Sequence, residues 1–464
     1  MVFSDLFFLF AFLPAFILAY LAAGYADRKL FSPLDDHKFK ARNLVTVIFS
    51  LIFYAWGEPV YVFLMLFCVF VNYLAGLGIE GSGKHRKLAL VLGITLNLLI
   101  LCTFKYLGFF AEILNGLGLN VAAPKIALPI GISFYTFQSL SYLVDVYRGQ
   151  SPAQKRFWDL LFYISMFPQL IAGPIVRYQT ISANIKNRTV TTEDFAEGAY
   201  RFLLGLGKKV ILANQLSEIS DRFLADGNFS TAGSWIGLLA FTFQIYFDFS
   251  GYSDMAIGMG RCLGFRFNEN FDHPYTCNSI TDFWRRWHIS LGTFFRDYLY
   301  IPLGGNRRHQ ALNILIVWFL TGMWHGASWN FILWGLYFGV IVTIEKYTIL
   351  KYKIPSFILH IYSLILVVLG WGIFYFDDFG KLGSLFKALF GNAQSASDFT
   401  SWAALTNNFW LWIAAITFSL PVRKLFKNAK GKWIYRTVIS LLILFCSVAL
   451  LIGATNNPFL YFRF

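Results

Sequence analysis

Long apolar runs alternate with short charged segments along almost the whole chain. A membrane-spanning helix needs about 20 apolar residues, and about twelve runs approach that length. This pattern predicts an all-α polytopic membrane protein with about twelve spans, in which residues 1–464 form a single membrane-embedded domain. The runs lie near 5–24, 43–56, 59–79, 87–112, 126–147, 199–220, 233–262, 311–326, 328–348, 355–376, 403–421 and 434–453.

Some stretches depart from this pattern. The runs 43–56 and 311–326 are short enough to be partial helices, and 157–176 carries Pro168 and Pro174 among apolar residues. Proline lacks the backbone donor that continues a helix. We therefore expect 157–176 to be a re-entrant or broken element whose backbone is satisfied by protein or water.

Residues 264–310 are too charged to span lipid, yet they are rich in aromatic side chains. Ser279 is a favourable N-cap residue and predicts a helix that begins near Ile280. On that helix Trp284 and His288 are four residues apart and would share one face. We predict an amphipathic helix at the cytoplasmic interface of the membrane.

The composition excludes several classes of protein. Hydrophobic residues make up 57% of the chain and charged residues only 14%, whereas a soluble globular chain carries roughly 25% charged residues. So few charges rule out an ordinary soluble enzyme, a disordered chain and a fibrous protein.

The positive charges orient the spans. The net charge is +14, and Lys and Arg gather in alternate loops such as 148–156 and 346–353. Cytoplasmic loops carry such an excess, so we expect a multi-pass protein of the plasma (inner) membrane with both termini outside. Arg28 and Lys29 follow the first run, the reverse of a signal peptide, which predicts an uncleaved first span. Because the Lys and Arg residues of these loops account for the positive net charge, binding to nucleic acid is not expected. The expected partner is the lipid bilayer.

Ionisable residues at membrane depth are costly and are therefore candidate functional residues. The strongest candidate is His325, which lies between apolar runs in GMWHG. A neutral imidazole can accept a proton from a hydroxyl group, and Gly322 and Gly326 would let a substrate approach the backbone. The alternative is a buried structural histidine that hydrogen-bonds a neighbouring helix.

Other candidates lie in the charged aromatic segment FWRRWHISLGTFFRDYLY. There His288 is a second candidate catalytic residue. Arg285 and Arg286 are candidates to bind the phosphates of a charged cytoplasmic donor, although an arginine-rich helix that only anchors to lipid headgroups is the slightly favoured explanation for them. Asp297, beside Arg296, is expected to form an ion pair within the fold.

Two acids, Asp248 and Asp254, stand in an apolar context near Ser250 and Gly251. We expect the helix to break at Ser250–Gly251, which would expose backbone groups to a cavity. The acids could take part in acid–base chemistry, but a role in capping the two half-helices is favoured. The chain has no phosphate-loop, zinc-protease or serine-hydrolase motif and no paired cysteines, so no metal is expected.

These motifs resemble a known family. FWRRWHISLGTFFRDYLYIPLGGNR followed by GMWHG is similar to the paired-histidine signature of the membrane-bound O-acyltransferases. LPIGISFYTFQSLSYLVDVYRG (128–149), FPQLIAGPIVRY (167–178) and QIYFDFSGYSDMAIG (244–258) resemble its bacterial branch, which O-acetylates exported polysaccharide such as alginate or peptidoglycan. The resemblance runs from the first span to the last residue. It implies a ring of tilted helices around a thin centre, with funnels from both membrane faces.

The resemblance also implies an activity. His325 matches the essential histidine of the family and His288 its second motif position. The implied donor is cytoplasmic acetyl-CoA, and the implied partner is an extracytoplasmic transferase of the SGNH type that places acetyl groups on an exported polysaccharide. An alginate-like polymer is the first expectation and peptidoglycan the alternative. From the residues alone, a transporter or a scaffold for the outer enzyme stays open.

The last residues, NPFLYFRF (457–464), would lie outside the membrane in this orientation. Their composition fits an aromatic anchor at the interface. They also resemble the C-terminal FxYFxF motif of the small partner peptide in the related teichoic-acid D-alanylation system, whose tyrosine is the implied acyl carrier. Tyr461 matches that tyrosine and is a third candidate catalytic residue, because its phenol can carry an acyl group.

Overall fold

The computed structural model describes the chain except for residues 31–37, 82, 84, 123, 125, 172, 226–229, 394, 423–431, 455–458 and 461–464. The described part is helical and contains no β-strand, which confirms the all-α prediction. Contacts divide the chain into two compact units. Unit 1 comprises Met1–Phe202 and Ser253–Asn268, and unit 2 comprises Leu203–Tyr252 and Glu269–Phe464.

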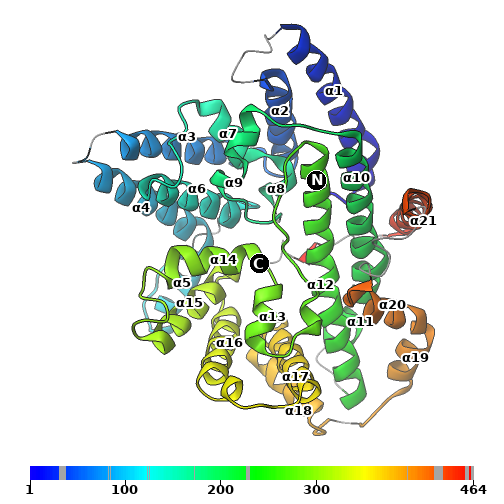
Figure 1. Cartoon of the computed structure of the whole chain (residues 1–464). Coiled ribbons are helices and arrows are strands. Elements are labelled where there is room, and N and C mark those ends of the chain that lie inside the picture. The colour runs from blue at the N-terminus through cyan, green and yellow to red at the C-terminus, as the bar shows by residue number, and fades with distance from the viewer. Residues whose placement is uncertain are drawn as a thin grey trace. The chain divides into compact units, whose positions relative to one another are not determined.

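Unit 1 contains the N-terminal helices. A π-helical turn at Phe8–Phe12 continues into α1, and α3, α4 and α6 pack against one another (Figure 1). Asn72 and Asn97 exchange side-chain hydrogen bonds of 3.1 and 2.8 Å between α3 and α4, so these buried amides satisfy each other. The helices are α1 Leu13–Leu30, α2 Lys40–Gly57, α3 Tyr61–Glu80, α4 Arg86–Lys105, α5 Leu107–Gly116, α6 Ile132–Tyr147, α7 Phe157–Ser165, α8 Phe167–Leu170, α9 Tyr178–Lys186 and the start of α10 Thr192–Gly207.

The break predicted within 157–176 is confirmed. Helix α7 ends at Ser165, and a short helix, α8, begins at Phe167 with Pro168 in its first turn. The side-chain oxygen of Ser50 accepts a 3.1 Å hydrogen bond from the backbone amide of Phe167. The protein itself therefore satisfies this interrupted backbone, as an element at membrane depth requires.

Unit 2 holds the remaining helices. Helices α15 and α16 form a tightly packed pair, and α17 packs on α16 (Figure 1). Short π-helical turns at Lys208–Ala213 and Arg296–Tyr300 and 3₁₀ turns at Pro274–Thr276 and Ile349–Lys351 join or extend the helices. The helices are α11 Asn214–Leu224, α12 Thr231–Cys262, α13 Ile280–Arg286, α14 Ile289–Phe295, α15 Gln310–His325, α16 Trp329–Tyr347, α17 Ser356–Tyr375, α18 Phe379–Leu389, α19 Phe399–Asn407, α20 Phe409–Ser419 and α21 Lys432–Gly453, of which α12 ends in unit 1.

Glycines explain the close pairing of α15 and α16. A Cβ on Gly322 would clash with the carbonyl oxygen of Phe331, and a Cβ on Gly335 would clash with that of Trp318. A Cβ on Gly326 would meet the Phe331 ring. The expectation that Gly322 and Gly326 make room for a substrate is therefore wrong, because Phe331 fills that space.

The predicted break of the helix at Ser250–Gly251 is also wrong. Helix α12 runs without interruption over its 32 residues. Gly251 is needed for packing, because a Cβ there would lie 2.8 Å from the carbonyl oxygen of Gly205. A glycine that permits a close helix approach and a glycine that ends a helix look alike in one sequence.

Six helices in the described part of the chain have the length and hydropathy of membrane spans. They agree with six of the predicted runs, while the total of about twelve stays a prediction. The run 403–421 is divided between α19 and α20. The six are Phe8–Lys29, Tyr61–Glu80, Arg86–Lys105, Trp329–Lys351, Ser356–Tyr375 and Trp433–Gly453.

Candidate functional site

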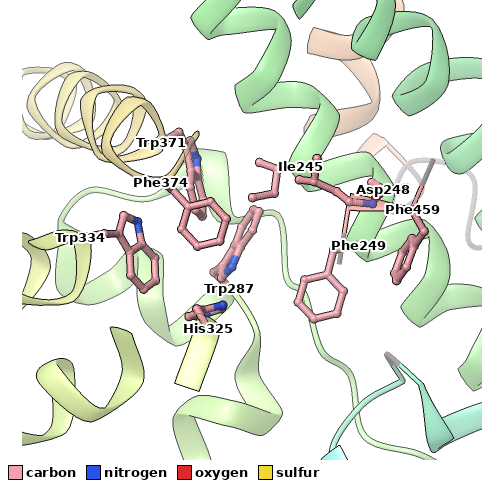
Figure 2. A pocket seen from close by; sticks show the side chains of 10 residues that line it. Ile245, Asp248, Phe249, Trp287, His325, Trp334, Trp371, Phe374 and Phe459 are labelled. Atoms are coloured by element: carbon pink, nitrogen blue, oxygen red, sulfur yellow. Dashed lines mark hydrogen bonds between the residues drawn. The ribbon is translucent and has the colours of Figure 1, made fainter. Parts of the chain in front are cut away.

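A cavity inside unit 2 is lined by side chains from four helices, one linker and the end of the chain. Its free volume is ≈ 20 Å³, which is room for roughly one water molecule. Figure 2 shows aromatic rings gathered around His325 at one end, with Asp248 beside Phe459 at the other. The lining residues are Ile245, Asp248, Phe249, Trp287, His325, Trp334, Trp371, Phe374, Phe459 and Leu460.

His325 is the last residue of α15 and is 8% exposed. Its ring centroid lies 4.9 Å from that of Trp334 and 5.4 Å from that of Phe374, each ring close to perpendicular to the imidazole. Edge-to-face packing of this kind fixes the orientation of a ring while keeping water away from it. The structure thus places the strongest sequence candidate in the wall of a cavity lined mainly by aromatic rings.

The predicted continuous helix through His288 is wrong, although its start is right. Ser279 caps α13, because its hydroxyl oxygen accepts a 2.9 Å hydrogen bond from the amide of Asp282. The helix then ends at Arg286, and His288 adopts a left-handed conformation with φ 46° before α14 begins. This conformation is unfavourable for a non-glycine residue and indicates that neighbouring contacts hold it.

Asn270 holds this kink. Its side-chain oxygen lies 3.1 Å from Nδ1 of His288 and accepts hydrogen bonds of 3.1 Å from the amide and 2.8 Å from the hydroxyl of Ser290. An amide oxygen can only accept, so Nδ1 of His288 carries the proton and Nε2 keeps a lone pair. Among the described residues, Nε2 of His288 has no hydrogen-bond partner.

His288 contacts the wall of the cavity without lining it. Its ring lies 4.7 Å from Phe249, a lining residue, and 5.9 Å from Trp324, the neighbour of His325. His288 lies outside the six candidate spans, and burial lowers its pKa to about 3. The two candidate histidines are therefore linked through the ring of Trp324, which contacts both.

The two arginines do not reach the cavity. Arg286 forms a 3.0 Å ion pair with Asp282, which raises the pKa of the guanidinium. Arg285 is exposed, and its charge acts on the nearby Lys346. Any contact of Arg285 with phosphate therefore takes place on the surface of unit 2. The expected pairing of Arg296 with Asp297 is confirmed at 2.6 Å.

The acids on α12 belong to separate ion pairs, and neither caps a half-helix. In unit 1, Asp254 pairs with Arg201 at 2.7 Å. In unit 2, Asp248 pairs with Lys209 at 2.6 Å, and both side chains are 3% exposed. Asp248 also accepts a 2.8 Å hydrogen bond from the amide of Leu460.

Sequence reasoning missed three residues that organise this region: Lys209, Asn270 and Glu345. Glu345 on α16 is fully buried and accepts hydrogen bonds of 2.6 and 2.8 Å from the amides of Ile280 and Thr281. It therefore caps α13 from another helix. Lys209 and Glu345 are charged residues within apolar runs, and this pattern could have identified them. No feature of the neighbouring sequence identifies Asn270.

Tyr461 lies outside the described residues, but Phe459 and Leu460, directly before it, are 4% and 5% exposed and line the cavity. In the described residues, no group of three or more His, Cys, Asp or Glu side chains is placed to hold a metal ion.

Comparison with known proteins gives consistent matches. Residues 154–379 match the model of the membrane-bound O-acyltransferase family. A probable alginate O-acetylase of Pseudomonas syringae pv. tomato is 43% identical over 403 residues, which cover 84% of this chain and 75% of the relative. A probable alginate O-acetylase of Pseudomonas putida is 38% identical over the full length of both chains. A peptidoglycan O-acetyltransferase of Helicobacter pylori is 30% identical over 100% of this chain and 98% of the relative.

Proposed function

Because the chain belongs to the membrane-bound O-acyltransferase family, we propose that it moves acetyl groups from cytoplasmic acetyl-CoA toward an exported polysaccharide. The chain is a multi-pass membrane acyltransferase, and its relatives support O-acetyl transfer. The observation that carries the proposal is the aromatic cavity with His325 in its wall.

In the proposed reaction, neutral His325 accepts the proton of an attacking hydroxyl group. The hydroxyl oxygen forms a bond to the acetyl carbonyl carbon, the carbon–sulfur bond breaks, and coenzyme A leaves with the proton. The surrounding rings exclude water, which limits hydrolysis of the thioester. The proposed acceptor is the phenol of Tyr461, the residue directly after Leu460, which would carry the acetyl group to the next enzyme.

The direct experiment uses the purified full chain with acetyl-CoA that carries a radioactive acetyl group. An acyltransferase breaks the thioester and releases free coenzyme A, and we expect His325→Ala to lose this release. A transporter would leave the thioester intact. Release of coenzyme A by His325→Ala at the wild-type rate would contradict the assigned base.

For the donor, we propose that Arg285 contacts a phosphate of acetyl-CoA at the surface of unit 2, together with the nearby Lys346. The exposure of Arg285 supports this, while Arg286 is engaged by Asp282. Arg285→Ala should raise the KM for acetyl-CoA about tenfold, the cost of one charge-assisted hydrogen bond. An anchoring role in lipid headgroups predicts an unchanged KM and weaker membrane attachment.

For the acceptor, we propose an alginate-like polysaccharide, because the two Pseudomonas relatives are named alginate O-acetylases. Peptidoglycan is the second candidate, on the full-length match to the Helicobacter pylori enzyme. The proposed partner is an extracytoplasmic SGNH-type transferase that collects the acetyl group. To distinguish the two acceptors, the chain is expressed in cells that make either alginate or peptidoglycan as the available polymer. Ester-linked acetate is then measured on each polymer.

The alternating positive loops support an orientation with both termini outside the inner membrane. In a chain with its native cysteines replaced, Asn392→Cys should react with an impermeant thiol reagent added from outside. Lys430→Cys should react only after the membrane is made permeable. The reverse pattern would contradict the orientation and the proposed role of Tyr461.

A further inference from the structure

The end of the chain enters the His325 cavity through a defined set of contacts. The amide of Leu460 donates a 2.8 Å hydrogen bond to Oδ2 of Asp248, and Oδ1 of the same carboxylate lies 2.6 Å from Nζ of Lys209. One carboxylate therefore joins the backbone of the tail to a lysine from the π-helical turn before α11.

The side chains on either side of this amide are also held. The ring of Phe459 lies 4.8 Å from that of Tyr252, and Nζ of Lys209 lies 5.8 Å from the Phe459 centroid. Leu460 belongs to the buried apolar core of unit 2. The tail is thus positioned by one backbone hydrogen bond and by the burial of the Phe459 and Leu460 side chains.

A buried ion pair adds little to the free energy of unfolding, because the desolvation of both charges offsets their attraction. A carboxylate that accepts a backbone hydrogen bond, by contrast, makes a strong and directional contact. The two oxygens of Asp248 make these two contacts separately: Oδ1 forms the ion pair with Lys209, and Oδ2 accepts the hydrogen bond from the Leu460 amide.

We propose that Asp248 and Lys209 form a clamp that holds Phe459 and Leu460 of the tail in the wall of the cavity. Asp248 and Lys209 are positioning residues in this proposal. It deepens, and rests on, the proposed role of Tyr461 as acetyl carrier.

The test compares two double variants of the full chain. Lys209→Met with Asp248→Asn removes both charges and keeps an oxygen that accepts a hydrogen bond. Lys209→Met with Asp248→Leu removes both charges and the acceptor. Neither variant leaves a single buried charge without its partner, which is the usual cause of misfolding when one member of such a pair is removed.

Hydrogen–deuterium exchange of the peptide that contains Leu460 reads the clamp directly, because a donated amide exchanges slowly. We expect the Leu460 amide to exchange at least tenfold faster in the Asp248→Leu variant and within threefold of wild type in the Asp248→Asn variant. Peptides of α15 and α16 should exchange alike in both, which controls for folding. Equal exchange of the Leu460 amide in the two variants would overturn the proposal.

Tyr461→Phe separates the clamp from the carrier. It deletes the phenol oxygen, so it should abolish acetylation of the polymer while the Leu460 amide stays protected. An active Tyr461→Phe enzyme with a protected Leu460 amide would reject the carrier and leave the clamp standing. Loss of protection at Leu460 only in the Asp248→Leu variant, together with loss of its polymer acetylation, would support both.

Discussion

Two buried histidines of unit 2 stand in different kinds of surroundings. His325 ends a helix and lines a cavity among aromatic rings, whereas His288 lies at a strained turn and is held through Nδ1 by Asn270. The first lines a cavity of ≈ 20 Å³. The second has a tautomer fixed by Asn270 and is separated from that cavity by the rings that it contacts. The difference suggests a base that meets the substrate and a second imidazole that supports the cavity.

The largest expected effect concerns His325. His325→Ala should lower acetyl transfer by about 10²–10⁴-fold, the usual contribution of a general base. His85→Ala is the matched control, because His85 is exposed in unit 1 and should tolerate the change. Acetyl transfer is measured as release of coenzyme A by protein that elutes as a single species. If His325→Ala and His85→Ala released coenzyme A at the same rate, His325 would not be the general base.

The second effect concerns the support of His288. Asn270→Leu removes the acceptor that fixes the tautomer. We expect acetyl transfer to fall about 10–100-fold, by analogy with the hydrogen-bond partners of metal-binding imidazoles. His288→Gln should cost a similar factor. The double variant should be no worse than either single variant, because both act through one imidazole. Losses that multiply in the double variant would show that Asn270 acts independently of His288.

The third effect concerns the packing behind His325. Gly322→Ala should destabilise the protein by about 1–3 kcal/mol, because α16 leaves no space for the added Cβ. Gly383→Ala on α18 is the control, since its Cβ would meet no atom within 4 Å. Thermal unfolding in detergent measures both. A neutral Gly322→Ala would show that the close approach of α15 and α16 is not what positions His325.

The smallest effect is a pH dependence of stability at His288. An unfolded histidine binds a proton below about pH 6.5, whereas folded His288 with its pKa near 3 does not. Stability is therefore complete above pH 6.5 and is lost as the pH falls toward 3, by about 1 kcal/mol at pH 6. His288→Gln should flatten this slope in thermal unfolding at pH 6–8. An identical slope in the variant would mean that His288 titrates normally.

These contrasts show what the sequence could and could not predict. Apolar runs predict helices because every backbone amide and carbonyl in lipid must be hydrogen-bonded within the protein, which few structures other than a helix allow. Pro168 marked the break between α7 and α8, because proline cannot continue the hydrogen-bond pattern of a helix. The roles expected of Gly251 and Gly322 were wrong, because each is required by close contact with another helix, which the local sequence does not reveal. His325 was found because it is an ionisable residue in an apolar context, which is a local signal.

The links that organise the site are long-range, and this is why they were missed. Asp248 meets Leu460 across 212 residues of sequence, and Glu345 caps a helix that begins 65 residues earlier. The kink at His288 depends on Asn270, which is 18 residues away. Helical spacing carries no information about such pairs, so it placed His288 on a continuous helix that does not form.

Acetyl transfer at His325 onto the tail is the central step of the proposed function. Mass spectrometry of the peptide that contains Tyr461, after incubation of the full chain with acetyl-CoA bearing a deuterated acetyl group, tests this directly. We predict one deuterated acetyl group on Tyr461 in the wild-type chain and none in His325→Ala or Tyr461→Phe. An unmodified tail in a wild-type chain that releases coenzyme A and supports polymer acetylation would contradict the account.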